Sequence, residues 1–449
     1  MHTYQDLLKI ADASDQDRIE FCATIVREHK TSDLYKTASI ANDYDRHRNT
    51  TIMAYQKLLY TVSGNVVPDN WSANYKLASN FFHRFALQQN QFLLGNGVQW
   101  QNDATSEKLG ADFDIQLQKL GHAAIVGGVS FGFWNLDHMD VFSVLEFAPI
   151  YDEENGALRG GVRFWQIDAK KPIRYTLYEE NGYTDYMVKD GKGSVVHEKR
   201  TYIQSVRTSE ADGTEIYNLE NYPAFPIVPL WANQQKQSEI VGIREQIDAF
   251  DLIRSGFCNT VDEASLVYWT ITNAGGMDDI DLAQFISRMK TVHAVNLDDE
   301  VKAESHTIDA PFEARETLLD RIRKDLYEDY MALDTKEISG GAVTATQIKA
   351  AYEPMNSKAD EYEYCIHDFI DGLFAIVGID DEPTFTRSTM INTSEEITTI
   401  IQAASYLGDD YVTRKILSIL GDADQAEDVL KNMDAEELDR ANLNTEEDE

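Results

Sequence analysis

The segment 311–370 combines two stretches of helical apolar spacing with a short loop that contains two glycines. The first stretch carries large apolar side chains three or four residues apart, which is one face of an α-helix: Leu319, Ile322, Leu326, Tyr330 and Leu333. Gly340 and Gly341 lie in the loop, where glycine reaches backbone angles closed to other residues. A second helix is predicted from Ile348, with a bend at Pro354 because proline lacks the amide hydrogen. By itself the segment predicts a helix-loop-helix hairpin in a helical domain.

The first half of the chain changes from helical spacing to alternating spacing near residue 120. Residues 74–97 predict a helix that ends at Gly95, and a shorter helix is predicted over 106–120. Between 121 and 230, short β-rich runs alternate with turn dipeptides and predict an antiparallel β module. The predicted hairpin turns are Asn155 with Gly156, Asn181 with Gly182, and Asp190 with Gly191. Three prolines close the module and predict a stiff connector and domain boundary: Pro223, Pro226 and Pro229.

Residues 238–265 carry apolar side chains at alternating steps of three and four, which is the 3.5-residue period of helices packed lengthwise. The positions are Ile240, Ile243, Ile247, Phe250, Phe257, Val261 and Ala264. A long helix buried in one globular domain has the same period, so both interpretations stay open. Residues 266–310 predict an insert with a strand over 266–272, a short helix over 278–290 and a strand over 291–297. Two long helices around this insert predict an elongated molecule with the insert at its far end.

The C-terminal part of the chain alternates short structured runs and ends in acidic sequence. A strand is predicted over 384–387, and helices are predicted over 395–407, 409–419 and 424–438. Residues 439–449 are mostly acidic and polar and predict a disordered acidic tail. Taken together, these patterns predict an α+β protein that is mainly helical.

Acidic residues outnumber basic ones by 77 to 40, which gives a formal net charge of −37. Such a surface repels phosphate, so the charge argues against a protein that grips nucleic acid through basic patches. A hydrophobic fraction of 43% supports folded domains with sizeable cores. The three cysteines form no CxxC pair and suit a reducing compartment: Cys22, Cys258 and Cys365. Neither a signal peptide nor a run of about 20 apolar residues stands in the sequence, so we expect no membrane partner.

One short motif suggests an enzyme. Residues 128–132, GVSFG, match the G-x-S-x-G pattern of serine hydrolases, with Ser130 as the nucleophile. The run that follows predicts a further strand where that motif needs a helix, so the hydrolase stays only an alternative. The sequence shows neither a phosphate-binding loop nor the spacing of metal ligands, so we expect no cofactor and no metal. The acidic run Asp380, Asp381 and Glu382 predicts a solvated turn, with calcium binding as the alternative.

Five segments follow one another in a specific order along nearly the whole chain. They are the helix 74–97, the β module with its runs 127–134, 148–152 and 173–175, the helix 238–257, the run 337–342 before a long helix, and the run 384–387 before the C-terminal helices. This order resembles the portal proteins of tailed double-stranded DNA phages, in particular those of siphophages that infect Gram-positive bacteria. Each segment is unspecific alone, and the order of the segments carries the resemblance.

The resemblance implies a ring, usually of twelve subunits, at one vertex of the capsid. It implies a wing over 1–237, stem helices over 238–265 and 311–334, a clip over 266–310, a tunnel loop over 335–343, a long kinked helix returning to the wing over 344–384, and a crown over 385–438. The implied partners are further copies of the chain, double-stranded DNA without sequence specificity, the terminase large subunit, the major capsid and scaffolding proteins, and a head-tail adaptor. The chain itself would carry out no catalysis, and it would enter the virion after assembly in the host cytoplasm.

The resemblance also assigns roles to three groups of residues. The DNA-facing tunnel loop comprises Thr335, Lys336, Glu337, Ile338, Ser339, Gly340, Gly341, Ala342 and Val343. The clip residues facing the terminase or adaptor are Asp278, Asp279, Asp281, Gln284, Arg288 and Lys290. Stem packing between subunits falls to Ile240, Ile243, Ile247, Phe250, Phe257, Leu319, Ile322 and Leu326.

The tunnel loop offers two features for contact with DNA. Gly340 and Gly341 are expected to act as hinges that let the loop move around the duplex. Lys336 is the only cation in the loop, although Glu337 beside it offsets that charge. An acidic channel wall would repel the duplex and let it slide, but the acidic residues could equally lie on the outside. An acidic adaptor or scaffold protein unrelated to phages stays open as a further alternative.

Overall fold

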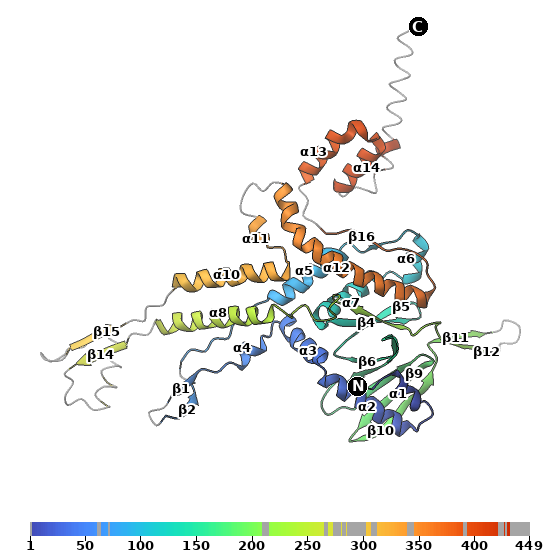
Figure 1. The fold of residues 1–449 in the computed structure, drawn as a ribbon, viewed down its shortest axis with the longest axis horizontal. Coiled ribbons are helices and arrows are strands. Elements are labelled where there is room, and N and C mark those ends of the chain that lie inside the picture. The colour runs from blue at the N-terminus through green and yellow to red at the C-terminus, as the bar shows by residue number, and fades with distance from the viewer. Residues whose placement is uncertain are drawn as a thin grey trace, which may run out of the picture.

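The computed structural model describes most of the chain as an α+β fold that is mainly helical. The described residues are 2–60, 64–70, 72–208, 215–264, 268–272, 302–306, 312–338, 345–388 and 393–420, together with 280, 284, 426 and 429–431. Within them, no helix combines the length and the apolar character needed to cross a bilayer. Figure 1 shows a body of helices and sheets from which a pair of long helices extends to one side.

The N-terminal part is helical, as its spacing predicts. Its helices are α1 (Tyr4–Lys9), α2 (Asp15–Thr31), α3 (Asp33–Asp45), α4 (Thr50–Ala54), α5 (Phe81–Leu94), α6 (Asp103–Leu109) and α7 (Phe113–Gly127). Serine side chains begin α2 and α3, because the Oγ atoms of Ser14 and Ser32 accept hydrogen bonds from free amides of the first turn. The helix predicted over 106–120 is instead two helices, because Gly110 adopts a left-handed φ of 84° between them.

The helix predicted over 74–97 is shorter than expected, since α5 begins only at Phe81. Residues 74–80 are extended and lie along helix α8 (Arg244–Ala264). Backbone amides of Tyr75, Leu77 and Ser79 donate to three side chains spaced four residues apart on α8, namely Asn259, Ser255 and Asp251. Because these amides are already hydrogen-bonded to α8, the segment does not need to be helical to satisfy them, although its local sequence favours a helix.

The β module contains two main antiparallel sheets. One sheet has the order β10-β9-β8-β7-β6, and the other has the order β13-β4-β5. The strands are β4 (Val129–Asn135), β5 (His138–Ser143), β6 (Phe147–Tyr151), β7 (Leu158–Trp165), β8 (Ile173–Glu179), β9 (Gly182–Lys189), β10 (Lys192–Arg200) and β13 (Ile227–Trp231). A separate hairpin pairs β11 (Ile203–Thr208) with β12 (Glu215–Glu220). Hairpins are found at all three predicted positions, but the turn between β8 and β9 is formed by Glu180 and Asn181, because Gly182 already begins β9. Asp190 and Gly191 both take positive φ as a two-residue turn requires.

The three prolines do not form a separate connector, so that part of the prediction is wrong, and the domain boundary near them stays a prediction. They lead into β13, and Pro229 lies within the strand, opposite Phe131 of β4. β13 lies at the edge of its sheet, where proline removes no needed hydrogen bond. Its residues Ile227 and Leu230 are buried, so the segment is part of the core.

Two long helices extend from the body, as the apolar spacing predicts. Helices α8 and α10 (Phe312–Tyr330) lie side by side in Figure 1, and strands β14 (Tyr268–Thr272) and β15 (Lys302–His306) pair at their far end. β14 confirms the first predicted strand of the insert, whereas β15 carries no signal that the sequence analysis detected. The predicted strand over 291–297 lies outside the described residues. A hairpin of β1 (Leu58–Tyr60) and β2 (Val66–Pro68) projects on the same side of the body.

The C-terminal half returns to the body and then leaves it. A short helix α11 (Thr335–Ile338) precedes helix α12 (Ala345–Val377), which continues through Pro354 and changes direction along its length in Figure 1. Strand β16 (Thr384–Phe385) pairs with β3 (Val98–Gln99), so it joins the C-terminal part of the chain to the N-terminal part. Helices α13 (Thr393–Ala403) and α14 (Asp409–Leu420), with the 3-10 turn η1 (Ala404–Tyr406), stand apart from the body. The acidic tail and most of the last predicted helix lie outside the described residues.

Candidate functional site: the joint at the inner end of the helix pair

The end of α10 nearest the body is held by aromatic packing against α5. Tyr330 stacks on Phe85 with ring centroids 4.8 Å apart, and Tyr327 meets the same ring edge-on at 5.0 Å. Both tyrosines are buried, as is Leu326 one residue earlier. The predicted apolar face of this helix is therefore the face that packs on the chain's own core.

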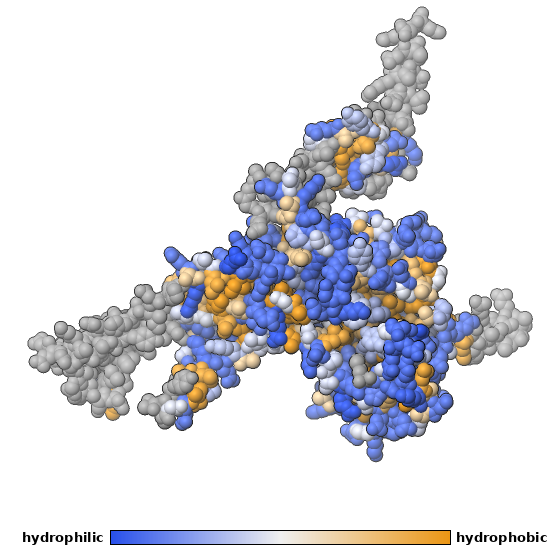
Figure 2. Space-filling model, in the orientation of Figure 1, coloured by the Kyte–Doolittle hydropathy of each residue, from blue (hydrophilic) through white to orange (hydrophobic). Residues whose placement is uncertain are grey.

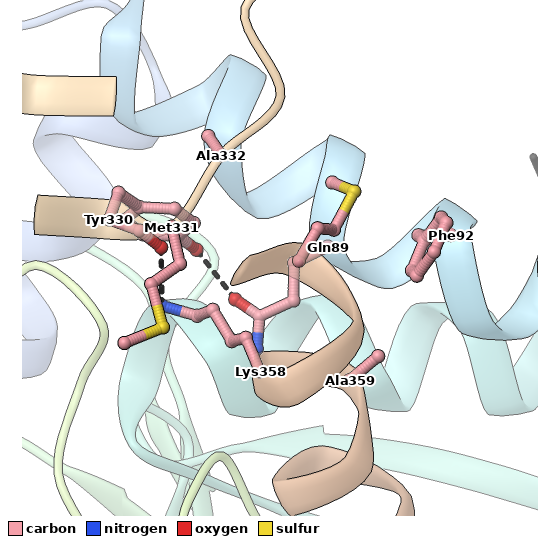
Figure 3. A pocket seen from close by; sticks show the side chains of 8 residues that line it. Gln89, Phe92, Tyr330, Met331, Ala332, Lys358 and Ala359 are labelled. Carbon is pink, nitrogen blue, oxygen red and sulfur yellow. Dashed lines mark hydrogen bonds between the residues drawn. The ribbon is translucent and has the colours of Figure 1, made fainter. Parts of the chain in front are cut away.

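A buried charge joins α10 to α12 and to the segment before α8. Lys358 of α12 places Nζ 2.6 Å from Glu239 Oε2, and Nζ also donates to the Tyr330 carbonyl oxygen at 3.1 Å. The same ammonium group lies 3.6 Å from the centre of the Tyr330 ring. Figure 3 shows Lys358 and Gln89 converging on Tyr330 from two different helices.

The Tyr330 hydroxyl completes the joint on the α5 side, where it donates to Gln89 Oε1 at 2.7 Å. Burial raises the pKa of Tyr330 well above its ordinary value near 10, and the charge of Glu239 adds to the effect. The hydroxyl therefore stays protonated and acts as a donor throughout the physiological pH range. Three helices thus meet on one tyrosine through a hydrogen bond, a ring stack and a cation.

The cavity at this joint is too small for a substrate. It has a volume of about 10 Å³ and is lined by Gln89, Phe92, Tyr330, Met331, Ala332, Met355, Lys358 and Ala359. That space matches one water molecule. Gln89 Nε2 is buried without a hydrogen-bond partner among the described residues, so one water here would satisfy it. We interpret the site as a mechanical joint that holds the helices in place.

The joint leads directly into the predicted tunnel loop. α10 ends at Tyr330. The next residue, Met331, takes a left-handed φ of 62°, and the Ala332 amide then donates to the Tyr327 carbonyl oxygen at 2.9 Å. Arg323 Nη2 donates to both carboxylate oxygens of Asp334, at 2.5 and 2.7 Å, which ties the turn back to α10. Asp334 also accepts the Lys336 amide at 3.1 Å and so begins α11.

The first four residues of the predicted loop are helical. Thr335, Lys336, Glu337 and Ile338 form α11, so the prediction of a continuous loop over 335–343 needs this correction. Thr335 and Lys336 are exposed. Ser339, Gly340, Gly341, Ala342 and Val343 lie outside the described residues, and the hinge role of the two glycines stays a prediction.

The residues predicted to pack between subunits fall into two groups. Four of them are almost fully buried in the core of their own chain, where they are not exposed to a neighbouring subunit, so their predicted role in subunit packing does not fit this structure. They are Ile240, Ile243, Ile247 and Leu326. Phe250 and Ile322 line the margin of the same core, Leu319 is half-buried, and Phe257 contacts Phe312 at 5.5 Å between ring centroids. For this second group, contact between subunits stays a prediction.

The helix pair also exposes apolar residues that the sequence analysis did not assign to subunit contacts. Leu252, Val261, Phe312 and Leu318 are exposed to 42, 47, 46 and 47%. Figure 2 shows apolar residues gathered over α8 and α10. Leu252 and Leu318 lie outside the 3–4 repeat, so a search for one apolar stripe passes over them.

Three further expectations concern chemistry or partners. Ser130 is fully buried within β4, and its Oγ donates to the Leu120 carbonyl oxygen at 2.7 Å. No helix follows it, so the hydrolase alternative is wrong.

Asp381 accepts hydrogen bonds from Thr105 Oγ and from backbone amides before α6, and these lower its pKa. This supports a turn that caps a helix. Of the clip residues, only Gln284 is described, as exposed and helical, and the others, Asp278, Asp279, Asp281, Arg288 and Lys290, lie outside the described residues.

A family model for phage portal proteins of the SPP1 Gp6-like type matches residues 29–443. The chain belongs to this family. The portal protein of Clostridium phage phiCD119 is 23% identical over 279 residues, which cover 57% of this chain and 58% of that protein. The portal protein of Bacillus phage SPP1 is 20% identical over 417 residues, which cover 85% of this chain and 79% of that protein. The match thus spans little more than half of the Clostridium phage protein.

Among solved structures, the neck of a gene transfer agent particle, determined in the native and in the empty state, resembles this portal protein at 11% identity. The TM-scores are 0.43 and 0.46, with 75 and 76% of this chain covered and 89 and 90% of the neck chains. The family match therefore carries the assignment. It identifies a structural protein of a phage virion, and it overturns the alternative of an adaptor unrelated to phages.

Proposed function

We propose that copies of this portal protein assemble into the ring-shaped DNA channel at one capsid vertex. A terminase would package the genome through the ring, and the genome would leave through it at infection. The ring would also nucleate capsid assembly together with the major capsid and scaffolding proteins, and later dock a head-tail adaptor. Membership of the portal family supports each of these roles, and the energy for packaging would come from the terminase.

One observation carries the proposal of a ring. The α8–α10 pair extends from the body with exposed apolar side chains, including Leu252 and Leu318. A helix that packs apolar side chains on its own core and also exposes others to solvent needs a second covering surface. In a ring, the neighbouring copies of the same pair would supply that surface.

The ring is tested by native mass spectrometry and electron microscopy of the purified chain, with the double variant Val261→Glu/Leu318→Glu beside the wild type. We expect a closed ring of about twelve copies for the wild type and smaller species for the variant, because charges at a packed contact lose their hydration. Ile167→Glu is the matched control, since Ile167 is 88% exposed on a loop of the β module. Wild-type protein that stays monomeric under assembly conditions, or a variant that forms intact rings, would overturn the proposal.

The segment that we place against DNA is 335–343. The joint around Tyr330 and the Arg323–Asp334 pair hold its first residues on a rigid frame, so motion would be confined to the residues beyond Ile338. Replacing Gly340 and Gly341 by proline should block packaging while rings still assemble. Packaging is measured as DNA protected from nuclease in filled capsids. Full packaging by rings of this variant would refute the hinge.

The net charge of −37 fits a channel that does not hold its cargo. Basic residues that neutralise phosphates bind DNA with an affinity that depends steeply on salt. An acidic wall would keep the duplex away from the surface and let it slide. The insert at the far end of the helix pair, with Gln284 exposed on it, is the region that we propose for terminase and adaptor binding.

A further inference from the structure

Three side chains of metal-ligand type meet in the N-terminal helical part, away from the joint around Tyr330. Asp45 is the last residue of α3, His83 lies in the first turn of α5, and His122 lies in the second half of α7. One ligand atom from each lies within 4.8 Å of the others. Successive members of the cluster are almost 40 residues apart in the sequence, so no short motif predicts it.

Two of the three distances between ligand atoms in the cluster are compatible with a tetrahedral metal site. Asp45 Oδ1 lies 3.0 Å from His83 Nδ1 and 3.1 Å from His122 Nε2. Zinc binds imidazole nitrogen and carboxylate oxygen at about 2.0–2.2 Å, so neighbouring ligand atoms at a tetrahedral angle are about 3.3 Å apart. The two observed separations differ from that value by a few tenths of an ångström. Both rings already direct a nitrogen at the carboxylate.

The three side chains of the cluster are partly exposed to solvent. The side chains of Asp45, His83 and His122 are 17, 34 and 27% exposed, so they are reachable from solvent yet partly shielded. Each neutral imidazole would present a lone pair by moving its proton to its other ring nitrogen. The His47 ring meets the His83 ring edge-on, with 5.2 Å between centroids, so a further imidazole lies beside the cluster.

We propose that Asp45, His83 and His122 bind one divalent transition-metal ion of the zinc type. Two imidazoles and one carboxylate supply three ligands, and water completes the fourth position. The ion would link α3, α5 and α7. Since α5 also carries Phe85 and Gln89, the metal would stabilise the helix on which the inner end of α10 is packed.

The test uses the full chain, purified without a histidine tag and treated with a chelator. Titration with zinc sulfate, followed by calorimetry, should give one saturable site per chain. Cobalt chloride should produce the visible absorption of four-coordinate cobalt with nitrogen ligands. His83→Gln and His122→Gln should each weaken zinc binding about tenfold or more, and zinc should raise the melting temperature of the wild type more than that of either variant.

His138→Gln is the matched control, because His138 is exposed and contacts Asp137 and Asp140 without a second histidine. Its zinc affinity should equal that of the wild type. Circular dichroism checks that each variant is folded, and the cobalt spectrum of the wild type reports on the site without any substitution. Failure of wild-type protein to bind zinc at one ion per chain, or equal binding by the His83 and His122 variants, would overturn the proposal.

Discussion

Replacing Lys358 by Met tests whether the joint around Tyr330 holds α10, α12 and the segment before α8 together. The Lys358 and Glu239 side chains are only 15 and 12% exposed, and Nζ and Oε2 are 2.6 Å apart. Removing one partner of a fully buried ion pair costs about 3–5 kcal/mol, because the other charge is left without compensation. The methionine keeps the apolar stem, so little packing is lost.

Two features of this site reduce the expected cost. Glu239 keeps a hydrogen bond from Asn233 Nδ2 at 2.9 Å, and it retains some contact with water. Against this, the variant also loses the cation above the Tyr330 ring, worth about 1 kcal/mol. We therefore expect Lys358→Met to lower the free energy of unfolding by about 2–3 kcal/mol.

The assay is equilibrium unfolding in urea at equal protein concentrations, so that any effect of assembly is the same for every variant. Arg321→Met is the matched control, because the Arg321–Asp325 pair on α10 is 70 and 34% exposed and should contribute only about 0.3–0.5 kcal/mol. In Lys358→Met/Glu239→Gln, the two losses should fall short of additivity by about 1 kcal/mol or more. A Lys358 variant as stable as the Arg321 variant, or strictly additive losses, would refute the reasoning.

Two further perturbations test the packing of the body. Gly121→Ala should destabilise the protein by about 1–3 kcal/mol, because the added Cβ would lie 2.3 Å from the Tyr362 hydroxyl. Gly256→Ala is the control, because the space around its Cβ is open, and it should be neutral or slightly stabilising in the same urea assay. Equal effects of the two substitutions would contradict the packing argument. Burial lowers the pKa of His29, whose Nε2 lies 2.7 Å from the Val144 carbonyl oxygen, so the unfolded chain takes up the proton first as pH falls below about 6.5. Wild-type stability should therefore fall between about pH 6.5 and 5 more steeply than that of His29→Gln, and parallel pH profiles would show that His29 is not responsible.

Much of the secondary structure could be predicted because it depends on short-range chemistry. The hairpin turn at Asp190 and Gly191 follows from the φ angles that such a turn demands, and α8 and α10 follow from apolar side chains at helical spacing. The start of α5 was misplaced because residues 74–80 pair their amides with α8, more than 170 positions away. Helix propensity depends on the local sequence and therefore cannot account for a hydrogen-bond partner so far along the chain.

For the site as well, part could be predicted from the sequence and part depends on the tertiary structure. The sequence determined that two long helices enclose an insert, that a glycine-bearing segment follows, and that the chain carries a net charge of −37. Only the tertiary structure decided which apolar residues are buried in the core of the chain, such as Ile247, and which stay exposed, such as Leu318. It also brought Lys358 to Glu239, and His83 and His122 to Asp45. These groups meet because packed helices bring distant positions together, and the spacing of residues along one chain does not encode that path.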